Sequence, residues 1–246
     1  MDKNTILVAI ITLLAGFIGG FLLANSLNRS EMNSLRMQTE QGRAANSNTP
    51  QDADEQTLSP EEIRSKITEA DKNPTNFSFQ KNLGAGLYRY GSMKNDLQLL
   101  AESVRILNRA NSIDPKDFDV IVALGNAHFD IGFAKKDAAE FAGARDFYNK
   151  ALVIRPDDPD VRTDLGISYF VQEPPDYAKA AAELERVVSI NPRHDRSMQF
   201  IVQVYIKQKR ISDAEKTLAK IKEISPGNPS VADLTSQLNA AKGGLQ

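Results

Sequence analysis

Five prolines recur at nearly regular intervals, and this spacing constrains the fold more than any other feature of the chain. They are Pro74, Pro115, Pro156, Pro192 and Pro226, separated by 41, 41, 36 and 34 residues. A near-constant period of this size indicates supersecondary units that stack and bury one continuous core between neighbours. We therefore predict four repeated units. Their expected bounds are about 74–114, 115–155, 156–191 and 192–228.

When the units are aligned on these prolines, a Leu-Gly pair falls in register in the first three. The pairs are Leu83-Gly84, Leu124-Gly125 and Leu165-Gly166. Glycine has no side chain, so it permits a second helix to approach closely while the leucine packs between the two. Ala144, Ala180 and Ala214 are expected to serve the same contact from the second helix. The closing proline ends that helix, because it lacks an N–H group and disfavours helical geometry before it.

In this pattern the units resemble tetratricopeptide repeats, over about Pro74 to Asn228. The resemblance implies an all-α solenoid whose units are pairs of antiparallel helices. The fourth unit has the family's 34-residue period but carries Val202 where glycine is usual. The first two units are seven residues longer, and we expect the excess between the first helix and the middle of the second. The third is two residues longer, around 173–176.

Both ends of the predicted repeat domain, residues 59–246, carry helix signals of their own. Ser59-Pro60-Glu61-Glu62 is a capping box with proline at the first helical position, and it starts a half-unit that reaches Asn73. Residues 230–241 place four apolar side chains at helical spacing, which predicts a C-terminal capping helix. Asp117, Asp158, Asp195 and Asn228 follow closing prolines and are expected to cap the next helix.

The N-terminus predicts a transmembrane anchor over residues 1–25. Thr5 to Ala24 holds twenty residues without a charge, and at about 1.5 Å per residue such a helix spans roughly 30 Å, the thickness of a bilayer core. The alternative is a signal peptide cleaved after Ser26. Gly16 and Gly20 lie on one face of the span, where close helix approach would favour a homodimer. Residues 26–58 are mostly polar, and we expect a flexible linker.

The charge and the residue composition exclude several classes of function. The net charge is −2 with scattered Lys and Arg, so nucleic acid is not expected as a partner. The absence of cysteine excludes disulfides, thiolate zinc sites and a cysteine nucleophile. His128 is interpreted as a packing residue and His194 as a solvated one, and no ligand spacing indicates a metal. We therefore expect no catalytic site, no metal and no cofactor, and a protein that is not an enzyme.

The resemblance also implies a partner-binding groove, because first helices of such arrays line a concave surface that holds a peptide. The candidate groove residues are Lys81, Asn82, Tyr88, Asn126, Phe129, Thr163, Phe170, Arg196, Gln199 and Gln203. The three aromatic residues among them recur every 41 residues, which predicts exposed rings along one wall. If the rings belong to the core, the alternative binding surface is the lengthened loops around Gly91 and Gly132. Some family members clamp a chaperone's terminal carboxylate. Lys81 and Asn126 fit that clamp, whereas Ala85, Ala123 and Asp164 do not.

Together these features predict a membrane-tethered scaffold that binds a protein or peptide partner and assists assembly of an envelope complex. The expected place is a bacterial inner membrane, with the repeat domain in the periplasm. Two alternatives stay open at this point. One is a periplasmic or secreted assembly chaperone released by signal cleavage, and the other is an import receptor on an organelle surface.

Overall fold

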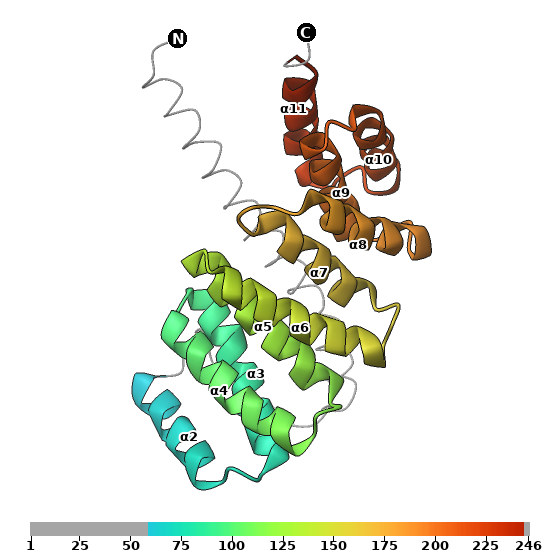
Figure 1. Cartoon of the computed structure of the whole chain (residues 1–246). Coiled ribbons are helices and arrows are strands. Elements are labelled where there is room, and N and C mark those ends of the chain that lie inside the picture. Colours follow the sequence, from blue (N-terminus) through green and yellow to red (C-terminus); the bar gives the residue numbers. More distant parts are fainter. Residues whose placement is uncertain (1–58, 244–246) are drawn as a thin grey trace, which may run out of the picture. The chain divides into compact units, whose positions relative to one another are not determined.

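The computed structural model describes residues 59–243, and over this range the chain is all-α (Figure 1). The predicted anchor, linker and Gly16–Gly20 dimer face lie outside the described residues. Within the described range, no helix combines the length and apolar character needed to cross a membrane. The helices there are α2 (Pro60–Lys72), α3 (Phe77–Lys94), α4 (Leu97–Ile113), α5 (Phe118–Lys135), α6 (Ala138–Ile154), α7 (Pro159–Val171), α8 (Tyr177–Ile190), α9 (Asp195–Lys207), α10 (Ile211–Ile224) and α11 (Ser230–Gly243).

The helices pair into four consecutive hairpins: α3 with α4, α5 with α6, α7 with α8, and α9 with α10. We call the leading member of each hairpin its first helix. The first helices α5, α7 and α9 each also pack against both helices of the preceding hairpin, and α11 does the same against α9 and α10 (Figure 1). This is the all-α solenoid that the proline spacing predicted.

Polar side chains at the N-caps explain where most helices begin. The Ser59 capping box is present, with the Ser59 hydroxyl accepting from the Glu62 N–H and the Glu62 carboxylate accepting from the Ser59 N–H. Asp117 and Asp158 cap α5 and α7, as predicted. The prediction for Asp195 is wrong, because this residue is already inside α9 and the His194 side chain caps that helix. The cap therefore lies two residues after the closing proline, as in α5 and α7, and His194 holds that position.

The extra residues of the first two units lengthen both helices of each hairpin. The helices α3 and α5 have 18 residues and α4 and α6 have 17, against 13 in α7 and α9 and 14 in α8 and α10. Gly91 and Gly132 therefore lie near helix ends and not in long loops. A Cβ atom added to Gly91 would lie 3.1 Å from the Leu100 nitrogen, and one on Gly132 would lie 3.1 Å from the Phe141 nitrogen. These glycines allow the two longer hairpins to turn tightly.

The glycines of the Leu-Gly pairs mark the points where the two helices of a hairpin touch. A Cβ atom added to Gly84 would lie 2.7 Å from Leu107 Cγ, and one on Gly125 would lie 2.7 Å from Tyr148 Cε1. At Gly166 the corresponding distance to Leu184 Cγ is 2.9 Å. Real Cβ atoms essentially never approach so closely, so each crossing requires glycine. This confirms the packing role predicted for the pairs.

Two buried polar side chains bind main-chain carbonyl groups that lie before their own first helices, which the sequence did not suggest. Gln80 Nε2 donates to the carbonyl oxygens of Ala70 and Asn73, at 2.8 and 2.9 Å, and so satisfies the end of α2. Two units later, Arg162 donates to the Pro156 carbonyl at 2.6 Å and pairs with Glu183. Both side chains sit at the same position of their first helix. They supply donors to carbonyl groups that a helix end leaves without intrahelical partners.

Candidate binding surface

Four successive first helices, α3, α5, α7 and α9, lie side by side and present one row of polar side chains. We call this row the first-helix wall. Its members are Lys81, Asp119, Asn126, Asp164, Arg196, Gln199 and Gln203. Within α5 and α9 the members are three, four or seven residues apart, and Lys81, Asp119 and Asn126 correspond in register to Gln199, Arg196 and Gln203. Asp164 joins them through its ion pair with Arg196. Five of the candidate groove residues therefore belong to one surface.

At one end of the wall, Lys81 joins α3 to α5. Its Nζ donates to Asp117 Oδ2 at 2.8 Å and to Asp119 Oδ2 at 3.0 Å. Burial lowers the pKa of Lys81, but the hydrogen bonds to these two carboxylates outweigh burial, so the net shift is upward. Burial likewise raises the pKa of Asp117, and the hydrogen bonds from Lys81 and the Val120 N–H carry it below its usual value. Lys81 and Asp117 are therefore charged at neutral pH.

At the other end, two contacts join α7 to α9. Arg196 pairs with Asp164 at 2.5 Å, and both side chains are less than one fifth exposed. His194 Nε2 lies 3.2 Å from Asp160 Oδ1, a hydrogen bond that holds the pKa of Asp160 below its usual range. The prediction of a solvated His194 is wrong, because its side chain is only 14% exposed between Asp160 and the start of α9.

Two amide side chains of the first-helix wall accept hydrogen bonds from other helices. The buried Tyr148 of α6 donates its hydroxyl to Asn126 Oδ1 at 2.9 Å. Burial raises the pKa of this phenol well above its usual value, and the nearby Asp164 charge adds to the effect. Ser230 at the start of α11 donates to Gln199 Oε1 at 3.0 Å. The Oε1 atom of Gln203 is buried and has no hydrogen-bond partner among the described residues, so it is an acceptor still lacking a donor.

The three predicted groove rings lie in the core, so the prediction of an exposed aromatic wall is wrong. Tyr88, Phe129 and Phe170 are each 6% exposed. Tyr88 packs on Ala127 and Ile131 of the next unit. Phe129 contacts Phe133 and Phe141, and Phe170 contacts Tyr177 and Phe200. Each position faces neighbouring helices and not solvent.

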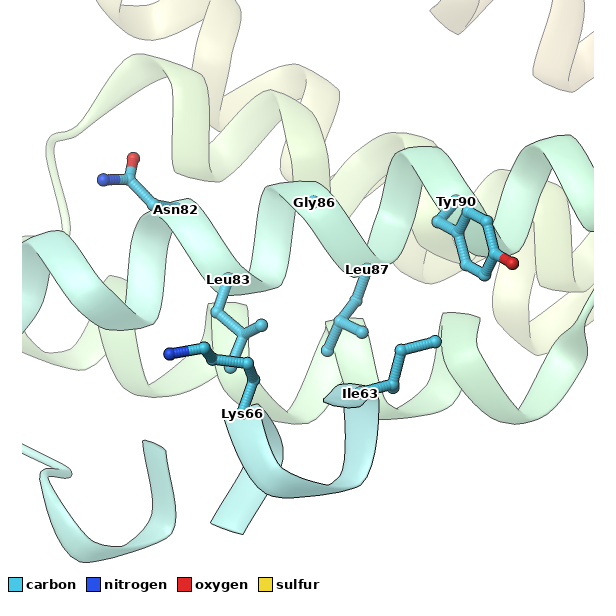
Figure 2. A pocket seen from close by; sticks show the side chains of 7 residues that line it. All are labelled: Ile63, Lys66, Asn82, Leu83, Gly86, Leu87 and Tyr90. Atoms are coloured by element: carbon cyan, nitrogen blue, oxygen red, sulfur yellow. The ribbon is translucent and has the colours of Figure 1, made fainter. Parts of the chain in front are cut away.

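Two further candidates lie away from the wall surface. Thr163 is fully buried, and its hydroxyl donates to the Pro159 carbonyl at 2.6 Å. Asn82 is exposed but lines a hollow between α2 and α3, described below (Figure 2). Whether the remaining candidates contact a partner stays a prediction.

His128 has the packing role expected of it. Its ring stacks on Phe147 with centroids 5.5 Å apart, and Nδ1 lies 2.6 Å from Glu140 Oε2. Within residues 59–243, no group of three His, Asp or Glu side chains is placed to hold a metal ion. The chemistry that the wall offers is recognition: fixed amides and carboxylates that can exchange hydrogen bonds with a partner's main chain or side chains.

The described part of the chain is a helical repeat array of the tetratricopeptide type. Residues 175–238 match the tetratricopeptide repeat family model. No curated protein sequence matches the chain significantly.

Solved structures show the same fold at low sequence identity. A crystal structure of MamA is 22% identical, with a TM-score of 0.54, over 67% of this chain and 81% of that one. MamA from Desulfovibrio magneticus RS-1, residue 41 to the end, is 16% identical, with a TM-score of 0.55, over 69% and 87%. YrrB, described as a TPR protein with an unusual peptide-binding site, is 17% identical, with a TM-score of 0.52, over 74% and 84%.

Proposed function

We propose that this protein is a membrane-tethered scaffold that binds a protein or peptide partner on the first-helix wall and does not catalyse a reaction. The observation that carries the proposal is the construction of the wall. Ion pairs at Lys81 and Arg196 fix neighbouring first helices to each other, so the surface exists before any partner arrives. A preformed surface loses little conformational freedom on binding, which favours affinity.

Further support comes from the amides and from the structural neighbours. The amide oxygens of Asn126 and Gln199 accept from Tyr148 and Ser230, which orients both amides, and amide N–H groups can donate to a partner's carbonyl groups. YrrB, which shares the fold, is a protein described as having a peptide-binding site. By analogy we assign the same class of ligand, a protein segment, to this chain.

The proposed membrane anchoring, cellular location and dimerisation are argued from the sequence of residues 1–58. The uncharged stretch Thr5–Ala24 supports anchoring in a bacterial inner membrane, and we place the repeat domain in the periplasm, where it would assist assembly of an envelope complex. The glycines Gly16 and Gly20 support a homodimer through the anchor. A mature chain beginning near Leu27 would instead support the released chaperone.

Site-specific photocrosslinking in native membranes tests which surface meets the partner. Val122 is partly exposed and has in α5 the register position that Lys81 has in α3. A photoreactive residue at Val122 or at Gln203 of α9 is expected to form adducts with one and the same protein. The matched controls are Ala182 of α8 and Ala219 of α10, which are exposed on second helices. Adducts from the controls alone would contradict the proposal.

A further inference from the structure

The N-terminal end of the array carries an apolar surface that is separate from the polar first-helix wall. A hollow between α2 and α3 is lined by Ile63, Lys66, Asn82, Leu83, Gly86, Leu87 and Tyr90 (Figure 2). The close-up shows Ile63 and Lys66 of α2 facing Leu83 and Leu87 of α3, with Tyr90 further along the same helix. The transfer of apolar side chains out of water lowers the free energy of the system. Such a hollow therefore favours an apolar occupant.

The repeat register shows what kind of element fits there. Gly86 and Tyr90 of α3 correspond, 41 residues later, to Ala127 and Ile131 of α5. In the second unit this pair is buried under Tyr88 of α3, which belongs to the preceding first helix. In the first unit, α2 takes the place of a preceding second helix, and no described residue fills the place of a preceding first helix. The hollow is therefore shaped to receive a helix.

Two details show that the site has room and extends beyond the hollow. A Cβ atom added to Gly86 would meet nothing within 4 Å, in contrast to Gly84 two residues earlier. Met93 lies about one turn after Tyr90 and is 65% exposed, the most exposed methionine, leucine or isoleucine side chain among the described residues. A helix seated over Gly86 would cover Tyr90 and could reach Met93.

The charges around the hollow indicate the occupant's chemistry. Arg89 is exposed, and Lys94 Nζ lies 5.9 Å from the centroid of the Tyr90 ring. Neither cation has a carboxylate partner among the described residues. Of the nearby acids on α2, Glu69 is paired with Lys66 and Glu62 is bound to the Ser59 N–H. Arg89 and Lys94 can therefore pair with carboxylates of an acidic partner at the Tyr90 end of the hollow.

We propose that this hollow docks an amphipathic helix of a protein partner, with acidic residues flanking its apolar stripe. The helix would take the place that a first helix occupies in each later unit. Its apolar side chains would pack over Gly86 against Ile63, Leu87 and Tyr90. Its carboxylates would pair with Arg89 and Lys94.

Binding of synthetic peptides to the full-length chain in detergent micelles tests the proposal. The probe is a labelled helix-forming peptide of about five turns, with Leu at every third or fourth position and Glu on the flanks. Its matched twin carries Lys in place of each Glu. Fluorescence anisotropy at low ionic strength is expected to give about threefold to tenfold tighter binding for the acidic peptide, with the difference fading as salt screens the charges.

Two variants distinguish docking in the hollow from non-specific attraction. A Cβ atom at Gly86 meets nothing within 4 Å, so Gly86→Trp is expected to place its ring in the hollow and to weaken the acidic peptide at least about tenfold, while circular dichroism shows that the chain stays folded. The double variant Arg89→Glu with Lys94→Glu is expected to reverse the preference between the two peptides. Equal binding of both peptides, or full binding by the Gly86→Trp variant, would overturn the proposal.

A photoreactive residue at position 86 in native membranes identifies other occupants. The proposal expects adducts on a helical, acidic segment of another protein, and the Arg89→Glu, Lys94→Glu chain should lose them. Adducts confined to residues 1–58 of this chain, or to a second copy, would overturn it. Charge substitutions on the first-helix wall should leave the acidic peptide bound, so this proposal and the wall proposal can fail separately.

Discussion

Gly125→Leu is expected to lower the free energy of unfolding by about 1–3 kcal/mol, the usual cost of overpacking. The first added atom would already lie 2.7 Å from Cε1 and 2.8 Å from Cδ1 of Tyr148. Tyr148 is fully buried, so it has no free space into which to retreat. Its displacement would also break the hydrogen bond to Asn126 and loosen the first-helix wall. Urea titration followed by circular dichroism measures the change.

Gly86→Leu is the matched control for this prediction. It makes the same substitution in a neighbouring first helix, at a site with nothing within 4 Å of the new Cβ atom. Because leucine is a better helix former than glycine, by up to about 1 kcal/mol, this variant should be at least as stable as the wild type. If both variants lost the same stability, contact with the second helix would not be the reason why Gly125 is required.

Phe129→Ala is expected to have the larger effect, a loss of about 3–5 kcal/mol. The ring is enclosed by Phe133 and Phe141 and is 6% exposed, so truncation leaves a cavity between α5 and α6. Thermal denaturation followed by circular dichroism measures it. Met93→Ala removes a large side chain that is mostly exposed, and its stability should stay within about 0.5 kcal/mol of the wild type.

The same variant separates the two interpretations of the ring. A core residue loses stability when it is truncated, whereas an exposed binding residue leaves stability unchanged and weakens the partner. A Phe129→Ala protein with wild-type stability and reduced partner binding would restore the original prediction of an aromatic wall. It would also show that the burial of Phe129 is not maintained in solution.

The repeat architecture could be predicted because it depends on local chemistry. The capping box at Ser59 and the closing prolines determine the backbone conformation of only the few residues next to them. Both signals can therefore be recognised from the sequence alone. The role of the Leu-Gly pairs could be predicted as well, because a glycine that recurs in register inside a helix indicates close helix packing. The extra turn in each helix of the two longer hairpins could not be predicted, because the length of a unit does not say where its additional residues lie.

The candidate surface was predicted in part. Helical spacing correctly grouped Lys81, Asn126 and Arg196 on first helices, but the rotation of one unit against the next decides whether a residue faces solvent. That rotation turns Tyr88 toward Ala127 and Ile131, and sequence periodicity carries no information about it. Similar reasoning applies to His194, whose contact with Asp160 spans two units.

The hollow at α2 and α3 shows a second limit of the sequence. Gly84 and Gly86 are two residues apart in one helix and look alike in the chain. In the structure, one touches Leu107 and the other faces open space. Only the position of α2, which covers α3 incompletely, separates them. A half-unit could be predicted from Ser59 onward, but the surface that it leaves open could not.

The most direct test of the account is the affinity of the crosslinked partner for two matched double variants of the full-length chain. Val122→Glu with Gln203→Glu adds two negative charges to the face of the first helices, and Ala182→Glu with Ala219→Glu adds the same charge to second helices. We predict that the first variant binds the partner at least about tenfold more weakly, roughly 1.4 kcal/mol, and that the second binds it as the wild type does. Both variants should stay folded at the assay temperature, and the first is expected to melt somewhat lower than the wild type because the side-chain oxygen at position 203 is buried. Loss of binding in the second variant, with full binding in the first, would contradict the claim that partners bind on the first-helix wall.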